Sequence, residues 1–150
     1  MRNAFSSSPA PSPVRRARGG LIALLLFLIA CQPSSPEEQL LKTVQPVGSW
    51  LASLEMTGRK WSSNSVPASF VEAMTASARE AIGKAAEEAA KSSARPGLRD
   101  PLRALLAEAE EAGRDLRRAV DQDDRAGVAR SVGRLSALHA RFEALTKGAA

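Results

Sequence analysis

The chain has a single cysteine, Cys31, and the residues before it predict what happens to that thiol. Arg15, Arg16 and Arg18 form a basic cluster, and residues 21–30 are all apolar. A basic front, an apolar core of about 7–15 residues and a small residue before the cleavage point are the parts of a secretory signal peptide. A membrane-spanning helix needs about 20 apolar residues, so this run is too short to be one. We therefore expect residues 1–30 to be a signal peptide.

The end of this stretch, Leu28-Ile29-Ala30-Cys31, closely resembles the lipobox of bacterial lipoproteins. The resemblance implies cleavage between Ala30 and Cys31, a lipid on the Cys31 sulfur, and acylation of the new amino terminus with a fatty acid such as palmitate. It also implies a location in the cell envelope. Gln32 stands where many lipoproteins of the inner membrane carry Asp, which favours the outer membrane, facing the periplasm. The alternative is a signal peptide that is cut without lipidation near an incidental cysteine.

The single histidine, His139, falls on the apolar arc of a predicted helix, between Val132 and Phe142. A histidine facing the core of a helical bundle can ligate haem iron, with Met56 or Met74 as the second ligand. The order of Met56 and His139 in the chain resembles that of periplasmic four-helix b-type cytochromes. A haem b protein for electron transfer is therefore the alternative function. If His139 is instead an ordinary histidine at the edge of the core, the chain has no cofactor.

The sequence does not predict an enzyme or a bound metal. No serine lies in a Gly-x-Ser-x-Gly setting, and one histidine cannot supply the two Glu-x-x-His pairs of a di-iron centre. The acids Asp121, Asp123 and Asp124 are followed by Arg125 and Ala126 where a calcium loop needs an oxygen ligand and a glycine. We expect these acids to cap a helix, and we expect no catalytic residue.

Trp50, Arg59, Lys60 and Trp61 form the most unusual local group of side chains. Tryptophan next to Arg or Lys is typical of a membrane interface or of a surface that binds a partner. Trp50 and Trp61 are eleven residues apart, about three helical turns, and so share one side of a helix. The group is a candidate interface patch, and the alternative is that the tryptophans close the end of a helical bundle.

The net charge of +5 belongs mostly to the segment that we expect to be removed. Residues 1–30 contain four of the 21 Lys and Arg residues and none of the 16 Asp and Glu residues, so the remainder carries a net charge of +1. A nucleic-acid-binding protein needs a basic surface that neutralises phosphates. We therefore exclude nucleic acid as a partner.

Apolar residues recur at helical spacing through the rest of the chain. Ser35, Pro36 and Glu38 make a capping box that opens the first helix. The apolar series keeps its phase across Pro46, which predicts one kinked helix, with two helices meeting at Pro46 as the alternative. The sequence predicts four helices, at about 37–61, 66–92, 101–120 and 124–147.

Each predicted helix has one apolar side, and the sides are thin because alanine is frequent. In the second helix the predicted buried residues are Phe70, Met74, Ala78, Ala81, Ala85 and Ala89, with Ile82 at the flank. In the first helix the predicted buried residues are Leu40, Val44, Val47, Leu51, Leu54, Gly58 and Trp61. In the third helix they are Leu102, Leu105, Leu106, Ala109, Ala112, Leu116 and Val120. In the fourth helix they are Val128, Val132, Leu135, Leu138, Phe142 and Leu145.

Four such helices joined by short loops predict an all-α, antiparallel four-helix bundle over residues 37–147, after a lipid anchor and short tether at 31–36. Elongated helical hairpins are the alternative, because thin apolar sides bury little area per residue. The function expected from the sequence is a non-catalytic binding module, held at the membrane by Cys31, whose partner is another envelope protein or a second copy of the chain.

Overall fold

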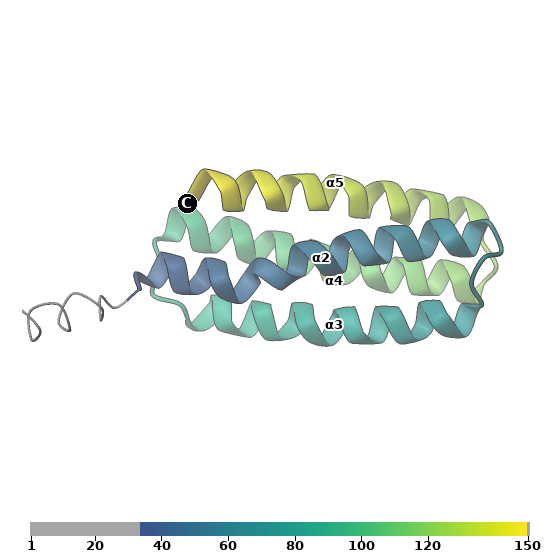
Figure 1. Cartoon of the computed structure of the whole chain (residues 1–150), viewed down its shortest axis with the longest axis horizontal. Helices are drawn as coiled ribbons and strands as arrows, with labels where there is room; N and C mark the ends of the chain where they lie inside the picture. The colour runs from purple at the N-terminus through teal and green to yellow at the C-terminus, as the bar shows by residue number, and fades with distance from the viewer. Residues whose placement is uncertain (1–33, 150) are drawn as a thin grey trace, which may run out of the picture. The chain divides into compact units, whose positions relative to one another are not determined.

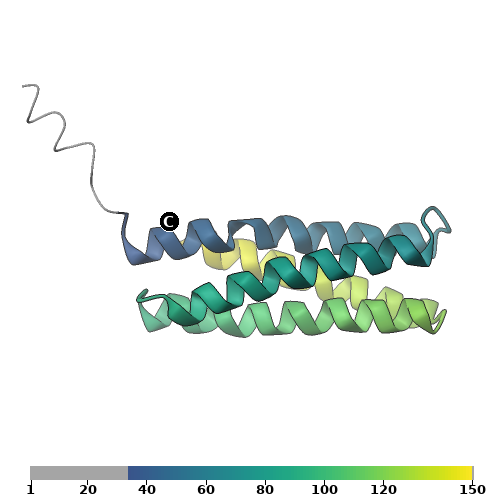
Figure 2. The same cartoon turned by 90° about the horizontal axis from the view of Figure 1, so that it is seen from below.

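A computed structural model of the chain describes residues 34–149. These residues form four helices and no strand: α2 at Pro36–Ser62, α3 at Ala68–Lys91, α4 at Pro96–Asp121 and α5 at Arg125–Ala149 (Figure 1). Successive helices run antiparallel, and α5 packs back against α2, so the four helices close into a bundle, as Figure 2 also shows. The predicted all-α four-helix bundle is confirmed, and the alternative of separate elongated hairpins is wrong.

The start of α2 follows the predicted capping pattern. The Ser35 hydroxyl accepts a hydrogen bond from the backbone N–H of Glu38 at 3.1 Å, and Pro36 occupies the first helical position. The helix continues through Pro46, so the prediction of one helix is confirmed and the two-helix alternative is wrong. Val44 and Val47, on either side of Pro46, are 0 % and 1 % exposed, and their burial offsets the cost of a proline inside a helix.

α4 begins at Pro96, five residues before the predicted start at 101. Pro101 was expected at the first helical position but lies inside the helix, on its exposed side. The added turn buries Leu98 in the core, which favours helix formation from Pro96 onward. Proline is suited to the first helical position at Pro96 as well as at Pro101.

The core is formed by one side of each helix, and three of the four sides are close to those predicted. The buried apolar residues of α2 and α4 include all those expected, whereas Val132 and Leu145 of α5 are only partly buried. In α3 the buried side is turned relative to the prediction: Val71 and Thr75 are buried in place of Phe70 and Met74. This rotation places both Val71 and Ile82 fully in the core, and it leaves Phe70 44 % exposed.

None of the helices described between residues 34 and 149 combines the length and apolar character required to span a membrane. The predicted signal peptide, the cleavage site at Ala30 and Cys31, and most of the tether lie outside the described residues.

Candidate functional site

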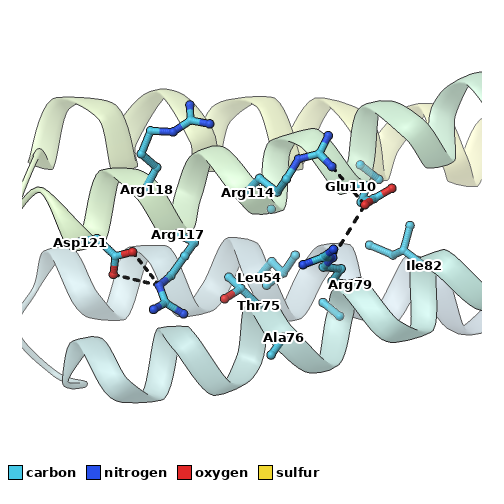
Figure 3. A pocket seen from close by; sticks show the side chains of 13 residues that line it. Leu54, Thr75, Ala76, Arg79, Ile82, Glu110, Arg114, Arg117, Arg118 and Asp121 are labelled. Atoms are coloured by element: carbon cyan, nitrogen blue, oxygen red, sulfur yellow. Dashed lines mark hydrogen bonds and ion pairs between the residues drawn. The ribbon is translucent and has the colours of Figure 1, made fainter.

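A groove between α3 and α4 brings an apolar floor together with several arginines (Figure 3). Its volume is about 290 Å³. The floor is apolar and includes Leu54 of α2, Ala78 and Ile82 of α3, and Ala109 and Gly113 of α4. The charged side chains along it are Arg79, Glu110, Arg114, Arg117, Arg118 and Asp121.

The groove exists because the facing residues of α3 and α4 are small. Ala76 and Ala78 of α3 and Ala109 and Gly113 of α4 carry at most one methyl group, so Leu54 of α2 reaches the floor from below. A Cβ atom at Gly113 would lie 3.6 Å from Leu54 Cδ1, an ordinary van der Waals distance. Short side chains on two adjacent helices therefore leave space that larger residues would fill.

Two arginines from different helices converge on one carboxylate at the middle of the groove. Arg114 Nη1 donates to Glu110 Oε1 at 3.1 Å, and Arg79 Nε of α3 lies 3.9 Å from the same oxygen (Figure 3). The side chains of Arg79 and Arg114 are 71 % and 53 % exposed, so both guanidinium groups are accessible from solvent. This part of the groove carries two positive charges for one negative charge.

At the end of the groove next to Asp121, the arginines are already paired with carboxylates. Arg117 Nε donates to both Asp121 carboxylate oxygens, at 2.8 and 2.9 Å, and Arg117 Nη2 lies 3.0 Å from Glu72 Oε1. These hydrogen bonds to Asp121 and Glu72 raise the pKa of Arg117 above its usual value. Arg118 also lines this end of the groove (Figure 3), and its Nη1 donates to Asp115 Oδ1 at 3.0 Å.

The arrangement is suited to binding. Guanidinium groups recognise carboxylates and phosphates through paired hydrogen bonds. The one hydroxyl of the groove, on Thr75, donates within α3 to the carbonyl oxygens of Val71 and Glu72, which lie at 2.9 Å. Within residues 34–149, no group of three or more His, Cys, Asp or Glu residues is arranged to hold a metal ion.

The candidate haem ligands are not gathered at one point. His139 of α5 lies opposite Gly48 of α2, where its Nε2 atom is 3.6 Å from Glu143 Oε1. Met56 is 53 % exposed and lies two turns further along α2, about 12 Å from Gly48 along the helix axis. Met74 belongs to α3, and no Cα atom of α3 lies within 8 Å of a Cα atom of α5. Haem ligation thus receives no support from the positions of these residues.

The predicted patch of Trp50, Arg59, Lys60 and Trp61 is divided between the core and the surface. Trp61 is 8 % exposed, and the guanidinium carbon of Arg125 lies 5.4 Å from the centre of its ring. Trp50 is partly buried against the core, while Arg59 and Lys60 face solvent, with Arg59 2.6 Å from Glu55. Trp61 therefore packs at the end of the bundle, as the alternative interpretation has it.

No sequence pattern indicated the arginine groove. The spacing along α4 places the side chains of Arg114 and Arg117 toward α3. Arg79 joins them in the groove only when α3 packs against α4. Comparison of the chain with protein-family models, with curated proteins and with solved structures finds no significant match.

Proposed function

We propose that the chain is a lipid-anchored, non-catalytic helical binding module of the bacterial cell envelope, attached to the outer membrane and facing the periplasm. The observation that carries this proposal is the contiguous pattern of a basic cluster, an apolar run and Leu28-Ile29-Ala30-Cys31. In bacterial lipoproteins a cysteine at this position receives the lipid. Gln32 supports the outer membrane as the destination.

The position of the first described helix is compatible with such an anchor. α2 begins at Pro36, so only Gln32-Pro33-Ser34-Ser35 separates Cys31 from the bundle. Four residues in extended conformation span at most about 14 Å. A lipid on Cys31 would therefore hold the first turn of α2 close to the bilayer surface.

The distribution of apolar and charged side chains in the bundle supports a binding role. The core is filled mostly by aliphatic side chains, with Trp61 and Phe142, and most charged side chains form ion pairs on the surface. The grooves between helices offer side chains for recognition, as the arginines of the α3–α4 groove do. The partner that we propose is another envelope protein or a second copy of this chain.

Lipidation can be tested by growing bacteria that express the full chain in radiolabelled palmitate. We expect label on the wild-type protein and on a Ser34→Ala control in the same tether, and none on Cys31→Ser. A companion variant joins Cys31→Ser to a signal peptide that is cut without lipidation, and we expect this protein in the soluble periplasmic fraction. Equal labelling of wild type and Cys31→Ser would contradict the proposal, as would membrane retention of the companion variant.

A further inference from the structure

We propose that the groove between α3 and α4 binds a small anionic amphiphile, meaning a single short alkyl chain with a carboxylate or phosphate head. This inference concerns the folded bundle alone and goes beyond the proposed lipid anchor. It rests on the charges at the middle of the groove, on the apolar floor and on the size of the space.

The head group would bind between Arg79 and Arg114. These two guanidinium groups share Glu110 Oε1, so one positive charge is in excess at this point. Each guanidinium has five N–H donors. At 3.9 Å from Glu110, Arg79 Nε is in ion-pair range and beyond hydrogen-bond range, so its donors can turn to a ligand. Because the two arginines come from different helices, an anion between them is held from both sides of the groove.

The far end of the groove would orient the ligand. There, Arg117 is held by Asp121 and Glu72, and Arg118 by Asp115, so each arginine already has a carboxylate partner. An anionic head therefore gains more between Arg79 and Arg114 than at this end. The charge pattern therefore selects one direction for a molecule that carries its charge at one end.

The alkyl chain would lie over Leu54 and Ile82, which are each 1 % exposed, so the apolar surface that it removes from water belongs mainly to Ala76 and to the aliphatic stems of the arginines. Covering apolar surface is favourable by about 25 cal/mol per Å² removed from water. The groove volume of about 290 Å³ is at the lower end of the range for small-molecule sites. A single short chain fits this volume, whereas a folded partner does not enter it.

Glu110 acts as an internal competitor in this arrangement, because its carboxylate accepts a hydrogen bond from Arg114 and lies within ion-pair range of Arg79. Replacing Glu110 with glutamine removes the competing charge and keeps the shape of the side chain. The proposal thus predicts that Glu110→Gln binds the ligand more tightly than wild type, an effect that a damaged fold does not produce.

The test is calorimetric titration of the full chain with hexyl phosphate, heptanoate, inorganic phosphate and hexanol. We expect saturable binding of at least one of the two amphiphiles, and binding at least tenfold weaker for inorganic phosphate and hexanol. Arg114→Gln should weaken binding about tenfold and Glu110→Gln should strengthen it about threefold, as expected for charge-assisted hydrogen bonds. Arg130→Gln, which changes an exposed arginine of α5 outside the groove, is the control and should have no effect.

The apolar part is tested separately with Ala76→Leu, which fills the groove from the exposed side of α3. Ala73→Leu is the control, because it makes the same change at an exposed position of α3 outside the groove. We expect only Ala76→Leu to weaken binding of the amphiphile. Absence of saturable binding, equal affinity for inorganic phosphate, or affinities unchanged by Arg114→Gln and Ala76→Leu would each overturn the proposal.

Discussion

Gly58 is a residue at which α2 approaches its neighbours closely. A Cβ atom there would lie 2.6 Å from Val132 Cγ2 and 3.1 Å from Leu116 Cδ1. Valine is stiff about its first side-chain torsion, and Leu116 is fully buried, so neither side chain can move away easily. The lack of a side chain at Gly58 therefore sets the distance between α2 and the α4–α5 pair.

We predict that Gly58→Ala lowers the free energy of unfolding by about 1 kcal/mol, because overpacking costs about 1–3 kcal/mol and alanine regains up to about 1 kcal/mol of helix propensity. Gly83→Ala is the control: nothing lies within 4 Å of a Cβ atom at Gly83, so we expect stabilisation of about 0.5–1 kcal/mol. Urea denaturation of the two proteins measures both values. Equal changes in the two variants would show that the close approach at Gly58 has no energetic consequence.

Arg125, at the start of α5, holds the loop between α2 and α3. Its guanidinium donates to the Ser62 carbonyl at 2.6 Å and to Asn64 Oδ1 at 2.9 Å, and it stacks on Trp61. Asn64 adopts a φ of 55°, a left-handed conformation that asparagine tolerates better than most residues. One side chain thus connects the end of α2, the loop and α5.

We predict that Arg125→Met lowers the midpoint of thermal unfolding by about 4 °C, because both hydrogen bonds and the stacking contact are lost. Arg130→Met should leave the midpoint nearly unchanged, since Arg130 makes only an exposed ion pair with Asp124 at 3.3 Å. Thermal unfolding followed by circular dichroism compares the two variants. A larger effect of Arg130→Met would contradict this account.

At the scale of the helices, the sequence predicted the number and approximate bounds of the elements, because apolar spacing and capping residues are local signals. It failed where two local solutions compete. Both Pro96 and Pro101 suit the first turn of α4, and only the burial of Leu98 decides between them. In α3 the many alanines left the buried side poorly defined, and packing against α2 and α4 selected Val71 over Phe70.

Charge complementarity explains the pairing of α4 with α5. α5 contains five Arg and Lys residues and one acidic residue, and it faces the acidic side of α4. Arg141 bonds to both carboxylate oxygens of Glu108, and Arg134 bonds to Glu111 and Asp115. Hydrogen bonds from Arg141 and Arg134, respectively, lower the pKa of Glu108 and of Glu111 below their usual values.

These shifts predict a loss of stability in acid. A carboxyl group whose pKa is lower in the folded state stabilises the fold above its unfolded pKa, and this contribution is lost as the pH falls through the folded pKa. We expect the midpoint temperature of thermal unfolding to fall as the pH drops below about 5. In the double variant Glu108→Gln, Glu111→Gln, we expect this fall to be smaller. Glu87→Gln, outside the α4–α5 interface, is the control with an unchanged pH profile. Identical profiles for all three proteins would contradict the assigned role.

For the whole molecule, the two candidate sites differ in how far sequence could predict them. The lipidation pattern is contiguous, so Cys31 and its neighbours could be identified from the sequence alone. The arginine groove needs Arg79 and Arg114 to meet across two helices that are separated in the chain. Its lining residues lie from the middle of α3 and α4 toward the end of the bundle opposite Pro36. An anchor at Cys31 would thus act at one end of the bundle, and a ligand in the groove would lie between its middle and the other end.

The central claim, that a lipid on Cys31 fixes the location of this protein, is tested most directly by the intact mass of the protein extracted from membranes. The account predicts a polypeptide that begins at Cys31, with added mass equal to the lipid on sulfur and the acyl group on the amino terminus. Peptide mapping should place the whole addition on the residue at the new amino terminus. A mass equal to the unmodified polypeptide, cleaved or uncleaved, would contradict the account.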